Sequence, residues 1–90
     1  MYADDAIVKN SLISDGCVIE GTVENCILFR GVKIGKGSVI RNSIIMQDSV
    51  IGVGVELDSV ITDKNVVIRD RRHLAGCAEL PFFIGKGRMI

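Results

Sequence analysis

The chain repeats one short phrase about every sixteen residues. Four versions begin at Asn10, Asn25, Asn42 and Asp58, each continuing with Ser or Cys and then two aliphatic residues. Their starts differ by 15 (25 − 10), 17 (42 − 25) and 16 (58 − 42) residues. A fixed period of this kind is typical of a solenoid, in which each repeat covers the hydrophobic face of the next.

Aliphatic residues also return about every six positions within a repeat, usually two positions after a small or β-branched residue. This is the hexapeptide pattern of a parallel β-helix, where three short strands and three turns make one triangular coil. The sequence therefore predicts an all-β parallel β-helix of about five coils. The residues predicted to point into its core are Ile13, Ile19, Leu28, Ile34, Ile40, Ile45, Ile51, Leu57, Ile61, Val67, Ile84 and Ile90.

The same residues are expected to stack in three columns, with neighbours one strand spacing, about 4.8 Å, apart. The first column runs through Ile13, Leu28, Ile45 and Ile61. The second runs through Ile19, Ile34, Ile51, Val67 and Ile84. The third runs through Val23, Ile40, Leu57 and Ile90.

A helical fold is the alternative, and the sequence argues against it. Amphipathic helices need apolar residues at spacings of three and four over long windows with few glycines. Val and Ile dominate here, and Gly, Asn or Asp interrupts every few residues, which favours strands and turns.

Charge and hydropathy favour a cytoplasmic protein. The net charge is zero, with 11 basic and 11 acidic residues mixed along the chain, so nothing indicates a nucleic-acid or membrane partner. No apolar run approaches membrane-spanning length, and the acidic start at residues 1–5 is unlike a signal peptide.

The three cysteines fit a reducing compartment, because an odd number argues against a disulfide framework. Cys17 and Cys26 occupy the small position of their hexads, so we expect them to be buried apolar residues. Cys77 lies outside the columns, and its role stays open.

The repeat breaks between residues 69 and 81. No hexad is visible there, yet Ile84-Gly85-Lys86-Gly87 repeats Ile34-Gly35-Lys36-Gly37. We therefore expect one β-helix domain over residues 1–90, with an excursion at 69–81 that replaces about two sides of a coil. Such an excursion is either a surface loop, a cap over the end of the stack, or a binding segment.

The excursion holds the residues with chemical potential. Arg69, Arg71 and Arg72 form the densest basic cluster, and arginine favours phosphate through its forked donors, so they are candidates for binding an anionic effector. His73 is the only histidine, which excludes a three-histidine zinc site. It is the candidate general base if the chain is a small hexapeptide acyltransferase. No catalytic residue or metal ligand is otherwise expected.

Several stretches resemble the β-helix of bacterial glucose-1-phosphate adenylyltransferases (ADP-glucose pyrophosphorylases). The resemblance is carried by residues 8–25, 28–40 and 42–46, and the ending 83–90 is similar to the second, glycogen-biosynthesis subunit of that family. Hexapeptide helices of this kind are left-handed, so the resemblance implies that hand. It also implies that the β-helix serves assembly and allosteric control in homo- or hetero-oligomers with adenylyltransferase subunits.

In the resembled family, a separate nucleotidyltransferase domain uses Mg and ATP to convert glucose 1-phosphate to ADP-glucose and pyrophosphate. These 90 residues contain no glycine-rich nucleotide loop. The resemblance therefore implies a fragment that needs no cofactor and is inactive alone. Two alternatives stay open: an acyltransferase using His73, and a pyrophosphorylase for another base or sugar.

Overall fold

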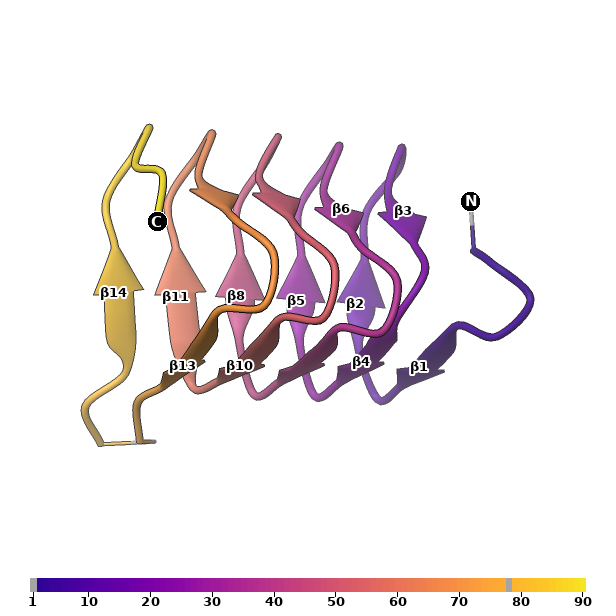
Figure 1. Ribbon diagram of the computed structural model, residues 1–90, viewed down its shortest axis with the longest axis horizontal. Helices are drawn as coiled ribbons and strands as arrows, with labels where there is room; N and C mark the ends of the chain where they lie inside the picture. The colour runs from indigo at the N-terminus through magenta and orange to yellow at the C-terminus, as the bar shows by residue number, and fades with distance from the viewer. Residues whose placement is uncertain (1, 78) are drawn as a thin grey trace.

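The computed structural model describes residues 2–77 and 79–90, and every regular element in them is a short β-strand. There are fourteen strands, wound around a triangular prism whose successive coils lie side by side along its long axis (Figure 1). Their bounds are β1 (Ile7–Lys9), β2 (Leu12–Ile13), β3 (Val18–Ile19), β4 (Thr22–Glu24), β5 (Ile27–Leu28), β6 (Lys33–Ile34), β7 (Val39–Arg41), β8 (Ile44–Ile45), β9 (Val50–Ile51), β10 (Glu56–Asp58), β11 (Val60–Thr62), β12 (Val67–Ile68), β13 (His73–Ala75) and β14 (Phe82–Ile84).

Every third strand pairs in parallel, which gives the prism three flat faces. Sheet A contains β3, β6, β9 and β12; sheet B contains β1, β4, β7, β10 and β13; sheet C contains β2, β5, β8, β11 and β14. The protein is therefore a left-handed parallel β-helix, as expected. Two sheets have five strands and one has four, so the helix completes slightly fewer turns than the five coils predicted.

The core is a set of aliphatic ladders that run along the prism axis. Sheet A turns Ile19, Ile34, Ile51 and Ile68 inward. Sheet B stacks Val8, Val23, Ile40, Leu57 and Leu74, and sheet C stacks Ile13, Leu28, Ile45, Thr62 and Ile84. Ile13, Val8, Leu74 and Ile90 lie near the ends and are only partly buried.

The expected register was wrong for Ile61 and Val67. Ile45 stacks on Thr62, an interval of 62 − 45 = 17 in the sequence, so Ser59 rather than Asp58 lies below Asn42. Ile61 and Val67 consequently face outward and are half-buried, while Val60 and Val66 fill the small corner positions. The resemblance of Asp58-Ser59-Val60-Ile61 to the earlier phrases hid this one-residue shift, which moves a side chain to the other face of a strand.

The columns expected for Ile84 and Ile90 were also wrong, each by one face of the prism. Ile84 stacks on Thr62 in sheet C, and the bridge from Val67 to Met89 places Ile90 below Ile68 in sheet A. The cause is an insertion, because the interval from Thr62 to Ile84 (84 − 62 = 22) exceeds the interval of the preceding coil (62 − 45 = 17) by five.

The excursion is shorter than the predicted range 69–81. Strand β13 pairs with β10 through Glu56–His73, and Arg71 N donates to the Val53 carbonyl at 2.8 Å, so residues 69–75 belong to the stack. The chain leaves the coil only after Ala75 and returns at β14. At Gly76 an added Cβ would lie 2.5 Å from Phe82 N, so the two arms of the detour meet at its base.

The corners explain why Asn and Gly punctuate the sequence. One corner holds Asn10, Asn25, Asn42 and Ser59 at positive φ, and the next holds Gly16, Gly31, Asp48, Asn65 and Gly87. Asn and Asp tolerate this left-handed conformation better than most residues, and Gly adopts it freely. The turn chemistry therefore recurs with the period of the coil.

Gly21 is needed for a different reason, a close approach of two coils. The step from Ile19 to Val23 is two residues shorter than the step from Ile34 to Ile40 in the next coil. This short cut brings the backbones together, so that an added Cβ at Gly21 would lie 2.4 Å from the Ser38 carbonyl oxygen.

Candidate functional site

The arginine cluster lies at one corner of the last full coil, where all three side chains are exposed. Arg71 has φ of 60°, at the corner where the two preceding coils carry Gly37 and Gly54. A bulky residue is uncommon in this conformation, so the corner places an arginine side chain where a glycine would be less strained. Arg69 and Arg72 flank it in the chain, and both are exposed.

Asp70, which lies between Arg69 and Arg71 in the chain, has a structural task. Its Oδ1 accepts a hydrogen bond from Val53 N at 2.9 Å, which fixes this corner to the preceding coil. Among the described residues the two ion pairs are Arg41–Glu24 and His73–Glu56, neither of which involves the cluster. The three guanidinium groups therefore present their donors to solvent.

His73 lies on the outer surface of sheet B. Its Nδ1 is 3.1 Å from Glu56 Oε2, and the two side chains are 63% and 57% exposed. The pair borders a shallow groove lined by Val39, Arg41, Glu56, Leu57, Asp58, His73, Leu74 and Ala75. This is an open surface with acidic and basic groups mixed along it.

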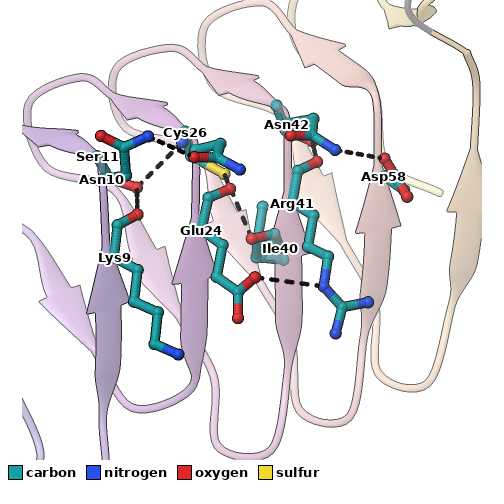
Figure 2. A network of polar contacts seen from close by, with 11 residues as sticks. Lys9, Asn10, Ser11, Glu24, Cys26, Ile40, Arg41, Asn42 and Asp58 are labelled. Carbon is teal, nitrogen blue, oxygen red and sulfur yellow. Dashed lines mark hydrogen bonds and ion pairs between the residues drawn. The ribbon is translucent and has the colours of Figure 1, made fainter.

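Sheet B also carries a ladder of alternating charge that the sequence analysis missed. Lys9, Glu24, Arg41 and Asp58 lie in one outward column, and Arg41 Nε is 3.7 Å from Glu24 Oε2 (Figure 2). Figure 2 also shows Asn42 Nδ2 donating to Asp58 Oδ1 at 3.2 Å. Exposed pairs of this kind contribute little stability, so the ladder chiefly favours correct register. The signal was present in the sequence, because these four charges recur with the period of the repeat.

Sheet C, in contrast to the charged sheet B, presents an apolar outer surface. Sequence reasoning missed this surface too. The outward residues Leu12, Ile27, Ile44, Ile61 and Phe83 lie in one column, here called the sheet C stripe. Leu12 is 70% and Phe83 60% exposed. The one-residue error at Ile61 hid the stripe, because it assigned one of its members to the core.

The cysteines divide into two buried thiols and one exposed thiol. Cys26 Sγ donates to the carbonyls of Glu24 at 3.0 Å and Ile40 at 3.3 Å. Burial raises the pKa of the Cys26 thiol above its usual range, because a thiolate would lose its hydration there. Cys17 is buried and its Sγ donates to the Phe29 carbonyl, while Cys77 is exposed on the detour.

Within residues 2–77 and 79–90, no cluster of three or more His, Cys, Asp or Glu side chains could hold a metal ion. The same part of the chain contains no helix with the length and hydropathy needed to cross a bilayer.

These features define a hexapeptide-repeat β-helix with one polar and one apolar face. The chain matches the family described as GlmU-like, C-terminal hexapeptide over residues 2–77, and it belongs to that family. Over 96% of its length it is 51% identical to the glycogen biosynthesis protein GlgD of Bacillus subtilis, of which it covers 25%. It is 44% identical over 86% of its length to a glucose-1-phosphate adenylyltransferase of Desulforamulus reducens, of which it covers 19%.

A glucose-1-phosphate adenylyltransferase of Bacillus thuringiensis is 41% identical over 76% of the chain, which covers 18% of that protein. The chain thus spans a quarter or less of the length of these relatives.

Proposed function

We propose that this β-helix is the assembly and regulatory region of a glucose-1-phosphate adenylyltransferase-type subunit in glycogen biosynthesis. The observation that carries the proposal is the 51% identity to a glycogen biosynthesis protein across nearly the whole chain. The adenylyltransferases that match at 44% and 41% support the same assignment. The corresponding reaction joins ATP and glucose 1-phosphate to give ADP-glucose and pyrophosphate.

In this proposal, nucleotide chemistry takes place in another part of the subunit. ATP and Mg²⁺ would be bound by that part, since phosphoryl-transfer sites hold Mg²⁺ through carboxylates and substrate phosphates in a shaped cleft. The β-helix would supply a rigid surface for contacts with homologous or different adenylyltransferase subunits. Its flat faces suit this role because solenoids present extended surfaces on a stiff scaffold.

The test combines the 90-residue chain with a purified glucose-1-phosphate adenylyltransferase from a Bacillus relative. The chain alone, given ATP, glucose 1-phosphate and Mg²⁺, should release no pyrophosphate above a blank. Added to the enzyme, it should co-elute on size exclusion and change the rate of ADP-glucose formation or its response to effectors. Pyrophosphate release by the chain alone, or no association with the enzyme, would contradict the proposal. Acyl transfer from acetyl-CoA, lost in His73→Ala, would instead favour an acyltransferase.

The regulatory half of the proposal assigns a phosphorylated effector to Arg69, Arg71 and Arg72. Supporting it, Arg71 lies at a corner that favours glycine, and the cluster has three positive charges against the single negative charge of Asp70. Titration of the chain with inorganic phosphate and with a sugar phosphate, followed by NMR, should shift signals of these arginines. Arg72→Ala should weaken that binding at least several-fold, whereas Arg30→Ala, an exposed arginine at another corner, should not.

A further inference from the structure

An open groove runs along the edge of the prism where sheet B turns into sheet C. In the first two coils it is lined by Asn10, Ser11, Leu12, Asn25, Cys26 and Ile27. The asparagine at each corner precedes the outward residue of sheet C by two positions, so amides form one wall and aliphatic side chains the other. The groove is therefore polar on one side and apolar on the other.

The groove carries no charge. Among its lining residues only Cys26 can ionise, and burial raises the pKa of that thiol, so it stays protonated at pH 7. The nearest charged column belongs to sheet B, where Lys9 and Glu24 have opposite signs. An uncharged groove offers no electrostatic advantage to a phosphate or another ion, so it favours a neutral ligand.

The amides of the polar wall keep hydrogen-bonding capacity. Asn10 Nδ2 donates to Asn25 Oδ1 at 2.7 Å, which orients both side chains. Within the part of the chain that the structure describes, Asn10 Oδ1 and Asn25 Nδ2 have no protein partner. The pair thus presents one acceptor and one donor along the wall, and a ligand hydroxyl can bond to either. Ser11 is engaged, because its hydroxyl donates to the Lys9 carbonyl and accepts from Cys26 N.

The apolar wall follows from the register of sheet C. Leu12 pairs with Ile27, so their outward side chains stack one strand spacing, about 4.8 Å, apart. Both side chains are exposed. Isolated exposed aliphatic residues are ordinary, but these two are contiguous with each other and with a row of amides that have free hydrogen-bonding groups. The groove therefore suits a ligand that is amphipathic across its width and repeats along its length.

We propose that this groove binds a linear, neutral glucan chain that lies along the prism. A pyranose ring has hydroxyl groups around its rim and a face of C–H groups, so the two walls match the two surfaces of the ring. One sugar unit is about as long as one strand spacing, so successive units meet equivalent side chains in successive coils. Asn42 and Ile44 continue the two walls into the third coil.

The inference deepens the function proposed above and rests on it for its purpose. A glucan site on this region holds the subunit that supplies activated glucose close to the polymer that consumes it. Because the groove is open and spans few sugar units, the dissociation constant for one oligosaccharide should lie in roughly the millimolar range.

NMR titration of the full chain with maltoheptaose, up to about 20 mM, tests the site. The side-chain amide signals of Asn10 and Asn25 and the methyl signals of Leu12 and Ile27 should shift together and saturate. Signals of sheet A should stay unchanged, because that sheet lies on another face of the prism.

The polar wall can be removed without straining the backbone. Asn25 has a φ of 53°, a conformation that glycine adopts freely, so Asn25→Gly deletes the amide and keeps the corner. It should raise the dissociation constant at least about fivefold. Asn65→Gly is the matched control, because Asn65 is exposed with a φ of 57° at the corner between sheets C and A. The control should leave the constant within about twofold.

The apolar wall has its own pair of variants. Leu12→Ser should weaken binding at least about threefold, because it removes the surface on which a sugar ring packs. Val53→Ser, at an exposed corner between sheets A and B, should leave binding unchanged. Circular dichroism verifies the fold of all four variants.

No shift at Asn10 and Asn25 up to the highest concentration, or equal weakening by Asn25→Gly and Asn65→Gly, would overturn the inference. If maltoheptaose does not bind but the chain associates with an adenylyltransferase, the proposed function stands and only the glucan site fails. Maltoheptaose binding without that association supports the site and contradicts the proposed function. Binding of cellohexaose in place of maltoheptaose would support a glucan site and contradict its link to glycogen.

Discussion

At the scale of single residues, stability in this protein depends on which of two neighbours points to the axis. Ile34 is 1% exposed and stacks between Ile19 and Ile51, whereas Lys33, one position earlier, is exposed on sheet A. The alternation of a β-strand makes adjacent residues energetically unlike.

Ile34→Ala should cost about 2–5 kcal/mol, because it leaves a cavity that the stacked coils cannot close. Lys33→Ala should change the free energy of unfolding by no more than about 0.5 kcal/mol. Urea denaturation of both variants checks the pair. Equal destabilisation would show that the inward columns are misassigned.

Thr62 is the one polar member of its inward column, between Ile45 and Ile84. Its Oγ1 accepts only a long hydrogen bond from Met46 N, at 3.4 Å, and Met46 N also donates to the Thr62 carbonyl at 3.3 Å. Thr62→Val should therefore stabilise the chain by about 1 kcal/mol, because a buried hydroxyl with a weak partner is replaced by a methyl. A lower melting temperature in the variant would contradict this account of the site.

The buried thiols should be unreactive in the folded chain. Burial raises the pKa of Cys26, so at pH 7 it stays protonated, and the thiolate is the reactive form. A native chain treated with iodoacetamide should be labelled at the exposed Cys77, and at Cys17 and Cys26 only after denaturation. Mass spectrometry of the labelled peptides reports the pattern. Labelling of Cys26 at the rate of Cys77 would mean that its coil opens frequently.

At the scale of strands and corners, the period of the sequence predicts the fold, and local insertions limit that prediction. The first columns, Ile13–Leu28–Ile45 and Ile19–Ile34–Ile51, follow directly from the hexads. The later columns do not, because a near-copy of the phrase at Asp58 is displaced by one residue and five residues are inserted before Ile84. The apolar outer column of sheet C could not be predicted, since it depends on the register of Ile61 between coils, whereas the charge ladder of sheet B follows the period and could have been found.

The detour after Gly76 should be dispensable for folding. Removing residues 77–81 deletes five residues and makes the interval from Thr62 to its partner in β14 equal to that of the preceding coil. The arms already meet at Gly76 and Phe82, so the new connection needs little movement. The shortened chain should keep its far-ultraviolet circular dichroism and melt within about 5 °C of the parent, a shift that corresponds to roughly 1 kcal/mol. Loss of cooperative melting would indicate instead that the detour caps the stack.

At the scale of the whole molecule, the two ends of the prism differ from its middle. The N-terminal segment covers the first coil, because Val8 stacks on Val23 and Tyr2 bridges to Ile19. Val23 is consequently fully buried, so a charge there would disrupt folding. The outer members Ile13 and Ile90 are only partly buried.

Hydrogen exchange should follow this gradient. A central coil has a neighbour on each side and an end coil has one, so opening an end costs less. Amides of β5, β6, β8 and β9 should exchange slowest, and those of β1 and β14 fastest. Exchange measured by NMR would show it. Uniform protection from end to end would mean that the solenoid opens only as a unit.

Because successive coils in the middle of the chain contain the same number of residues, this protein can be lengthened in units of one whole coil. Val23, Ile40, Leu57 and Leu74 follow one another at one constant interval (40 − 23 = 57 − 40 = 74 − 57), with unchanged pairing. A tandem duplication of one such interval would therefore lengthen the molecule by one strand spacing, about 4.8 Å, without altering any corner. Duplications that do not correspond to a whole number of coils would rotate the downstream sequence onto the wrong faces. The length of such a scaffold sets the distance between parts attached to its two ends. Duplications of whole coils in the gene would change that distance in fixed increments.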